Sequence, residues 1–384
     1  MSQHAFLSCS GAPAWSRCPA KPWLEKDLPD RSSPEAREGT AAHELRAMCL
    51  TMNTDAAAYL GRIIEVEGDA FEVTDDMVGH IQKSIDVLRQ FSGEMLVEVP
   101  IDIEHITSEA GAKGTADTVI LDYENATIIV DDLKYGRGVP VDAEDNEQAV
   151  LYGAGALEQF SMLADWQHVI VRISQPRINN DSEWRISVDE LRTRAGELAV
   201  KAAHILAGNA DTLKAVPGEK QCRFCKAQAT CPALLQTVMD EFEAVPEPTA
   251  ASDVDLAVSM SKVSLIEGWA NAVRAETERR LLAGTPVDGW KLVEGRRGAR
   301  SWMDDTAVEE AMKAMRLRQD EMYSMKLISP TQAEKLLKKD SPKRWAKLEE
   351  LITQSEGKPS VAPASDKRPA LVVSATVDEF ESLV

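Results

Sequence analysis

Hydrophobic and polar residues alternate with two different periods along roughly the first 210 residues. In residues 75–91 the apolar positions are three or four apart, which is the spacing of one face of a helix. Similar stretches predict helices at 34–50, 142–160 and 190–207. Apolar or strictly alternating runs predict strands at 95–103, 118–121, 127–130, 168–173 and 184–188. The order of helix, three strands, helix and strand predicts a mixed α/β sheet.

The pattern changes in the second half of the chain. Prolines and acidic residues at 245–249 predict a linker, and an apolar stripe over 253–282 predicts a long helix. A short strand at 290–294 and helices at 304–322 and from 329 onward are expected next, and a Ser, Pro, Ala and charge-rich end predicts disorder. We therefore expect a core domain at 1–245, a mainly helical domain at 246–355 and a disordered acidic tail at 356–384.

Two of the predicted strands, 118–121 and 127–130, flank a turn-like Glu-Asn pair and read as a β-hairpin. Asp117 precedes the first strand, and Asp132-Leu133-Lys134 ends the second. Because side chains alternate across a strand, Asp132 and Lys134 share one face while Asp131 lies on the other. With ordinary register, two carboxylates and a lysine converge at the end of the sheet.

This trio suits metal-assisted hydrolysis of a phosphodiester. Two close carboxylates repel each other unless a cation lies between them. Mg²⁺ or Mn²⁺ prefers oxygen ligands and keeps waters that can attack, and a lysine can orient such a water or stabilise the phosphate. The alternative at this point is an ordinary hairpin whose charged residues are solvated at its rim.

Cysteines form a second motif. Cys222, Cys225 and Cys231 follow a C-x2-C-x5-C spacing, which suggests metal binding by three thiolates. Both a closed zinc site and an iron–sulfur cluster need a fourth ligand, and Cys18 or Cys9 is available. Cys49 lies in a predicted apolar helix, where a buried free thiol is expected.

Composition limits the surroundings of the protein. The 43 basic and 63 acidic residues give a net charge of −20, which argues against a surface that coats nucleic acid generally. A locally basic channel is still compatible with this charge, and the candidates for phosphate contact, or simply solvated helix faces, are Arg296, Arg297, Arg300, Lys338, Lys339, Lys343, Arg344 and Lys347. Without an apolar run near 18 residues or a signal peptide, we expect a cytoplasmic protein with no membrane partner.

Taken together, the motifs resemble the PD-(D/E)xK nuclease superfamily, specifically its RecB-like exonuclease branch, over roughly residues 1–235. Five motifs stand in the family's order: His43 in a helix, Asp117 in Gly-Thr-Ala-Asp, Asp132-x-Lys134, Gln148-x3-Tyr152, and the cysteines. The layout of one early and three late cysteines resembles the iron–sulfur clasp of AddB-type nucleases. The whole chain also looks similar to uncharacterised phage and prophage proteins with this core.

The resemblance implies a restriction-endonuclease-like mixed sheet flanked by helices, with a mainly helical C-terminal region outside the match. It implies that Asp117, Asp132 and His43 hold Mg²⁺ or Mn²⁺, that Lys134 positions the attacking water, and that Gln148 and Tyr152 contact nucleic acid. Cys222, Cys225 and Cys231, with Cys18 as the better match for the fourth ligand, would hold a [4Fe–4S] cluster, zinc being the alternative.

We therefore expect a metal-dependent deoxyribonuclease of phage or prophage type that acts on DNA ends in recombination or DNA processing. Its partners would be DNA, single-stranded or with free ends, and a phage recombination or single-strand-binding protein. Two alternatives stay open: a non-cleaving nucleic-acid-binding scaffold on a nuclease fold, and a zinc-stabilised adaptor.

Overall fold

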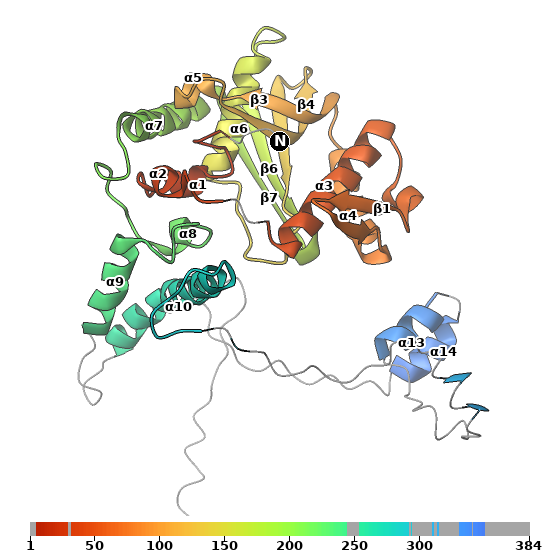
Figure 1. Ribbon diagram of the computed structural model, residues 1–384. Helices are drawn as coiled ribbons and strands as arrows, with labels where there is room; N and C mark the ends of the chain where they lie inside the picture. The colour runs from red at the N-terminus through yellow and green to blue at the C-terminus, as the bar shows by residue number, and fades with distance from the viewer. Residues whose placement is uncertain are drawn as a thin grey trace, which may run out of the picture. The chain divides into compact units, whose positions relative to one another are not determined.

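A five-stranded mixed sheet forms the centre of the computed structural model, which describes residues 5–29, 32–243, 253–291, 293, 309–310, 313–314, 330–339 and 341–349. The strand order is β3 (Glu94–Asp102), β4 (Lys113–Asp122), β5 (Thr127–Leu133), β6 (His168–Gln175) and β7 (Asn180–Ser187). Only β5 and β6 run parallel, and the other neighbours are antiparallel. The predicted mixed α/β fold with flanking helices is confirmed (Figure 1).

Alternating apolar residues give the sheet two buried faces. Val119, Val130 and Val171 join one large core, which includes residues of α6 (Glu147–Gln159) and α7 (Val188–Ala207). Their strand neighbours Ile120, Ile129 and Ile170 pack on the opposite face with Leu88 of α4. Period-two alternation puts successive side chains on opposite faces, so a strand that is apolar throughout must be covered on both. Figure 1 shows α7 on one side of the strands and α3 with α4 on the other.

Helices α3 (Pro34–Met52) and α4 (Asp75–Leu88) each begin after a capping residue. The Ser33 and Thr74 side chains accept hydrogen bonds from backbone N–H groups in the first turn of each helix. Helix α3 runs without interruption from Pro34 to Met52. Both helices share a core with β1 (Ile63–Val66), whose hairpin partner is β2 (Asp69–Glu72), and with Leu133 and Tyr135 at the end of β5. The 3₁₀ helix η1 (Ala56–Tyr59) links α3 to β1.

Helix α6 begins later than the hydrophobic pattern predicts. Asn146 is its N-cap and accepts from the N–H groups of Gln148 and Ala149, so residues 142–145 stay outside the helix. An asparagine N-cap marks the residue at which a helix begins, and hydrophobic periodicity alone does not detect it. The helix lies close to the sheet because Gly155 faces β3, where an added Cβ would lie 2.4 Å from Ile101 Cγ2.

The N-terminal segment is more regular than expected, with short helices α1 (Ala12–Trp15) and α2 (Lys21–Glu25). The N–H groups of Phe6 and Leu7 donate to the Glu109 carboxylate at 2.7 and 2.8 Å, just after α5 (Glu104–Thr107). Trp23 Nε1 donates to Ile205 O of α7 at 2.9 Å. These contacts hold residues 5–29 against the core.

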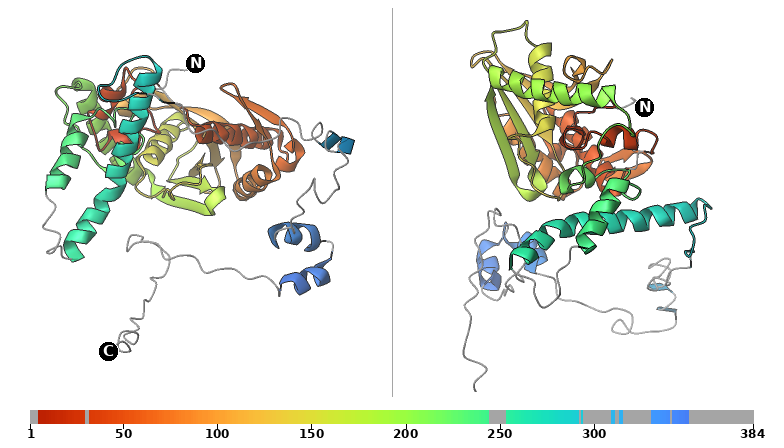
Figure 2. Two further views of the ribbon diagram at one scale, coloured as in Figure 1. Left: turned by 60° about the horizontal axis from the view of Figure 1, so that its bottom comes forward. Right: turned by 90° about the vertical axis from the view of Figure 1, so that its left-hand side faces the viewer.

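The chain divides into two compact units, Met1–Val293 and Glu294–Val384. Besides the elements above, the first unit includes η2 (Pro176–Ile178), α8 (Glu219–Cys222), α9 (Pro232–Glu243) and α10 (Asp253–Leu282), the long helix in Figure 2. Helix α10, which the sequence assigned to a separate C-terminal domain, therefore belongs to the first unit. Among the described residues near 290, the expected strand reduces to one β-bridge between Val287 and Trp290.

The second unit contains α13 (Pro330–Leu337) and α14 (Pro342–Glu349). Trp345 and Ala333 are buried there, and the basic residues Lys343, Arg344 and Lys347 of α14 are exposed. Several expectations lie outside the described residues: the linker at 245–249, the arginines 296, 297 and 300, most of the helix at 304–322, and the tail at 356–384.

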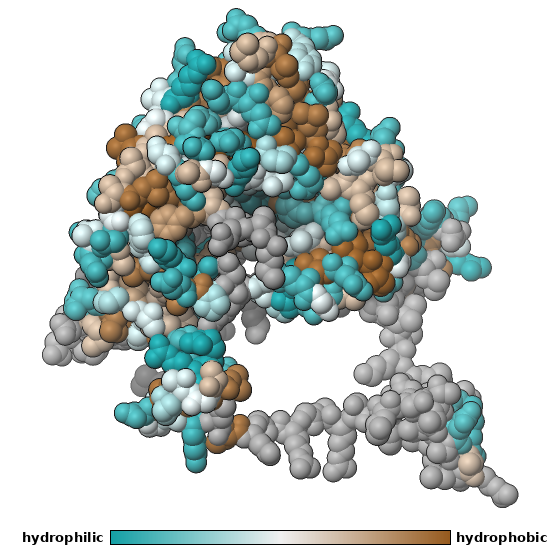
Figure 3. Space-filling model, turned by 45° about the horizontal axis from the view of Figure 1, so that its top comes forward, coloured by the Kyte–Doolittle hydropathy of each residue, from teal (hydrophilic) through white to brown (hydrophobic). Residues whose placement is uncertain are grey.

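The visible surface mixes hydrophilic and hydrophobic groups, as Figure 3 shows, which agrees with a chain in which 28% of residues are charged. Within the described part of the chain, each helix is too short or too polar to span a bilayer.

Candidate functional site

The register of the β4–β5 hairpin determines which side chains meet at its open end. Thr118 pairs with Asp131, so the next position outward sets Asp117 against Asp132. The backbone N–H of Leu133 donates to Asp117 Oδ2 at 2.7 Å. The two carboxylates therefore lie at the same end of the sheet, as the sequence pattern predicts.

Helix α3 supplies two side-chain partners for Asp117. His43 Nδ1 lies 3.1 Å from Asp117 Oδ1, and Arg46 Nη2 donates to Oδ2 at 2.9 Å. Residues three apart share a helix face, so His43 and Arg46 approach the carboxylate together. The Asp117 side chain is only 12% exposed, which excludes the reading of a solvated rim residue.

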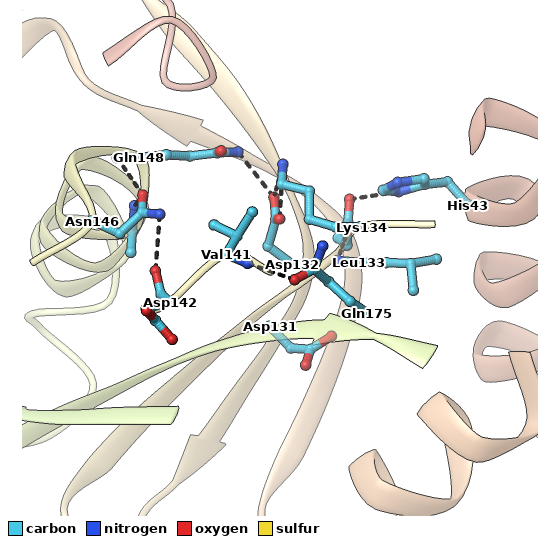
Figure 4. Close-up of polar contacts among 12 residues, drawn as sticks. His43, Asp131, Asp132, Leu133, Lys134, Val141, Asp142, Asn146, Gln148 and Gln175 are labelled. Atoms are coloured by element: carbon cyan, nitrogen blue, oxygen red, sulfur yellow. Dashed lines mark hydrogen bonds and ion pairs between the residues drawn. The ribbon is translucent and has the colours of Figure 1, made fainter. Parts of the chain in front are cut away.

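Asp132 lies on the face of β5 that α6 covers (Figure 4). Lys134 Nζ is 2.9 Å from its Oδ2, and Gln148 Nε2 donates to its Oδ1 at 3.0 Å. Apart from the ion pair with the lysine, the buried Oδ2 has no hydrogen bond of suitable geometry. Asp132 thus keeps one buried acceptor oxygen that is not fully satisfied.

The two carboxylates have opposite pKa shifts. Burial acts to raise the pKa of Asp117, but the hydrogen bond and charge of His43, together with Arg46, lower it to about 2. Burial raises the pKa of Asp132, and the negative charge of Asp117 adds to this effect, while Lys134 opposes it. A pair whose pKa values diverge in this way is typical of functional sites.

Asp131 points away from Asp132, as strand alternation predicts and Figure 4 shows. It is 1% exposed and makes two buried ion pairs, with Arg46 Nη1 at 2.5 Å and with Arg172 Nη1 of β6 at 3.4 Å. Arg46 also donates to Ser84 of α4. One buried arginine therefore joins Asp117 to the interior of the fold.

Glu98 is a site residue that sequence reasoning did not single out. Val97 pairs with Thr118 and Val99 with Ala116, so Glu98 lies opposite Asp117. Partial burial and the charge of Asp117 raise its pKa, and His43 and Arg46 act in the other direction. Its φ of +52° is left-handed in mid-strand, a strained conformation for a residue other than glycine. A single glutamate inside the apolar run 95–101 was the available signal.

Gly114, Tyr152 and Cys9 close the site from behind. An added Cβ at Gly114 would lie 2.7 Å from Tyr152 Cε1 and 2.8 Å from Cys9 Sγ, so this approach needs a glycine. Tyr152 is buried, and burial, together with Cys9 and Asp132, raises its pKa. Gln148 is also buried, and the prediction that Gln148 and Tyr152 contact nucleic acid stays a prediction.

The early and late cysteines meet in a second place. Cys18 Sγ accepts from the N–H of Val216 at 3.4 Å, and Cys222 Sγ accepts from that of Gly218 at 3.4 Å. Burial, with nearby Cys18 and Cys231, raises the pKa of Cys222. Burial and Glu25 raise the pKa of Cys225 to about 12, with a smaller effect of Cys222. We call Cys18, Cys222, Cys225 and Cys231 the cysteine group.

Cys9 Sγ lies beside Gly114 and Tyr152, and burial raises the pKa of Cys9 to about 12. Cys49 packs in the apolar core between α3 and α4, as predicted for a free thiol, and burial raises its pKa to about 11.

Comparison with known protein families identifies the family of this chain. The family described as "Protein of unknown function (DUF2800)" matches residues 4–369. The chain belongs to the DUF2800 family. A search of solved structures returns one titled "Crystal structure of SSO0001", which is 16% identical over 56% of this chain and 94% of that one, with a TM-score of 0.22.

The donor set at the sheet end of this DUF2800 protein fits a hard divalent cation. Carboxylates of Asp117, Asp132 and Glu98 supply oxygen, and His43 supplies nitrogen, which suits Mg²⁺ or Mn²⁺. The buried Oδ2 of Asp132 is a ready acceptor. The side chains are not arranged as a finished ligand sphere: within the described residues, no group of three or more His, Cys, Asp or Glu is set to hold a metal ion.

The cysteine group of the DUF2800 protein fits a thiolate-bound metal by its chemistry. Cys18 and Cys231 lie close enough to Cys222 to raise its pKa, and backbone N–H groups donate to the sulfurs of Cys18 and Cys222. Like the carboxylates, these thiols are not arranged as a finished ligand sphere within the described residues. Both an iron–sulfur cluster and zinc accept four cysteines.

Proposed function

We propose that this DUF2800 protein is a metal-dependent DNA exonuclease of phage or prophage type, built as a RecB-like member of the PD-(D/E)xK superfamily. One observation carries the proposal: the hairpin register brings Asp117 against Asp132, with Lys134 at 2.9 Å from an Asp132 oxygen that is buried and not otherwise hydrogen-bonded. Two carboxylates can hold a divalent cation, and a lysine beside them can act on the water or the phosphate, which together suit metal-assisted phosphodiester hydrolysis.

Asp117, Asp132 and His43 would hold the cation, with Glu98 as a further oxygen donor. When bound, Mg²⁺ or Mn²⁺ would act as a Lewis acid on the phosphate and lower the pKa of a bound water. Lys134 holds a positive charge next to Asp132, where it can orient the attacking water or stabilise charge on the phosphate.

Surrounding residues position the reacting groups. Gln148 fixes Asp132 by its hydrogen bond, and Arg46 fixes Asp117 from the buried side. Cys18, Cys222, Cys225 and Cys231 would hold a [4Fe–4S] cluster that ties the N-terminal segment to the chain after the core. In that role the four cysteines would stabilise the fold and take no part in the reaction at Asp117 and Asp132.

A second candidate, a non-cleaving nucleic-acid-binding scaffold, is favoured by one observation. Both oxygens of Asp117 already contact protein side chains, His43 and the cationic Arg46, and Asp132 contacts Lys134. The negative charge of the site is therefore balanced by the protein itself, which a binding protein without a catalytic metal also needs.

Cleavage assays separate the two candidates. Protein purified without oxygen is incubated with DNA labelled at the 5′ or the 3′ end, single- or double-stranded, in EDTA, Mg²⁺, Mn²⁺ or Ca²⁺. The exonuclease predicts stepwise shortening from one end with Mg²⁺ or Mn²⁺ and intact DNA in EDTA. DNA that is bound but intact with every metal and end structure supports the scaffold.

A further inference from the structure

A separate cavity of about 490 Å³ lies in the first unit, away from the carboxylates. Three segments form it: the chain after α2, the loop of late cysteines, and the last turns of α10. Its lining residues are Leu28, Pro29, Phe224, Lys226, Thr230, Glu276, Arg279 and Arg280. The volume is in the range of small-molecule sites.

Phe224 is the unusual member of this lining. It is 85% exposed, although large aromatic side chains are normally buried. It stands between Cys222 and Cys225 in a turn closed by the Cys225 N–H to Cys222 O hydrogen bond of 3.0 Å. Lys226, which follows Cys225, is held against α2, because its backbone N–H donates to Glu25 Oε1 at 2.7 Å. A phenyl ring is therefore presented to solvent by a turn that is held in place.

The cavity lining is also rich in basic residues for an acidic protein. It includes Lys226, Arg279 and Arg280 beside one acidic residue, Glu276, while the chain as a whole has a net charge of −20. Glu276 accepts from Arg279 at 2.6 and 2.8 Å and from Arg280 at 2.9 Å, which orients both guanidinium groups. Oriented arginines are well suited to phosphate oxygens.

We propose that this cavity binds one nucleotide of a single-stranded DNA, with the base stacked on Phe224 and the phosphate held by Arg279, Arg280 and Lys226. An exposed aromatic ring beside cations is the usual means of binding single strands, because every unpaired base has a face that can stack. In a duplex the bases stack on each other, so the ring would have no partner.

The N-terminal segment connects this cavity to the carboxylate site. Cys9 Sγ lies beside Gly114 at the start of β4, Arg17 pairs with Glu147 at the start of α6, and Leu28 and Pro29 line the cavity. The inference rests on the proposed function in taking DNA as the ligand: the cavity would hold the strand at a distance from the cut.

Equilibrium binding tests the proposal without any cleavage. A fluorescein-labelled oligo-dT of about 15 nucleotides is titrated in EDTA with full-length protein purified without oxygen, and anisotropy is followed. Phe224→Ala should weaken binding about tenfold, within the range for loss of one stacked base, and Phe224→Trp should restore it. The rescue by Phe224→Trp separates loss of stacking from damage to the cysteine loop.

Salt dependence reports the phosphate contacts. The double variant Arg279→Gln, Arg280→Gln should lower the slope of log K against log salt by roughly 1.4, about 0.7 for each lost contact to a single strand. Arg274→Gln, an exposed arginine on the same helix outside the cavity, is the matched control and should bind as wild type does.

Three results overturn the proposal: no binding of oligo-dT by wild type, equal binding by wild type and Phe224→Ala, or displacement of the probe by dTMP as effectively as by unlabelled oligo-dT. Tighter binding of oligo-U than of oligo-dT would replace DNA by RNA as the partner. These outcomes are independent of cleavage. A protein that cuts but binds normally without Phe224 keeps its proposed function and loses this inference, and one that never cuts can still bind through the cavity.

Discussion

Arg46 is the residue on which the geometry of the site depends most. It is 1% exposed and connects Asp117 to Asp131, which is itself buried and paired with Arg172. The sequence offered only a weak signal for it, its position three residues after His43 on α3. The contact to Asp131 joins segments 85 positions apart, and no local pattern predicts such a pair.

Replacing Arg46 should therefore cost stability. Arg46→Met leaves two buried carboxylates with reduced compensation, and we expect the free energy of unfolding to fall by about 3–5 kcal/mol in urea titrations. Arg89→Gln, which removes the largely exposed ion pair with Asp55, should cost less than about 1 kcal/mol. Equal losses for the two variants would contradict a special role for Arg46.

Asp117 gives a pH dependence of stability with a defined sign. Its folded pKa of about 2 lies below the ordinary value of 3.8, so it stabilises the fold above pH 3.8, and this contribution is lost as pH falls through about 2. The full difference corresponds to roughly 2 kcal/mol. Urea titrations of metal-free protein from pH 5 to pH 2 should show a shallower decline for Asp117→Asn than for wild type. Parallel declines would show that His43 and Arg46 do not hold the carboxylate ionised.

The secondary-structure elements were predictable where the pattern was strong and local. The helical spacing of apolar residues in α4 and the continuous apolar strands β4 and β5 predicted elements that carry or support the site. The start of α6 was predicted five residues too early. The residues before the cap Asn146 are mostly polar, and hydrophobic periodicity does not show where in such a stretch a helix begins. Helices α1 and α2, of four and five residues, are too short for a periodic signal.

The site residues were likewise predictable where the pattern is local and not where they depend on contacts between distant segments. Asp117, Asp132 and Lys134 were predictable because one hairpin sets their positions. Glu98 was visible in the sequence as a charged residue in an apolar run, but its place opposite Asp117 depends on the β3–β4 register. Strand alternation predicted that Asp131 faces away from Asp132. Its buried partners could not be predicted in this way, because Arg46 comes from helix α3 and Arg172 from strand β6.

At the scale of the whole molecule, a metal or cluster bound by the cysteine group would close a long loop between Cys18 and the residues after α7. A link across such a separation restricts the unfolded chain strongly. It also holds Phe224 and the cavity, so the stability of this region should depend on whatever the thiols bind.

The cysteine group should show an iron–sulfur signature. Cys225→Ser should remove a broad visible absorption near about 400 nm from protein purified without oxygen, because thiolate-to-iron charge transfer is lost. Cys49→Ser, at a buried thiol outside the group, should keep it. Stoichiometric zinc and no iron in wild type would contradict the cluster and favour the zinc-stabilised alternative.

The central claim is that Asp117 and Asp132 together support metal-dependent cleavage of DNA. The most direct measurement compares the rate of release from end-labelled DNA in Mn²⁺ by wild type, Asp132→Ala and Asp189→Asn, with folding checked by circular dichroism. Asp189, whose side chain is 99% exposed on α7, is the matched control. The account predicts cleavage by wild type and by Asp189→Asn and none by Asp132→Ala, and a folded Asp132→Ala that cuts DNA as fast as wild type would contradict it.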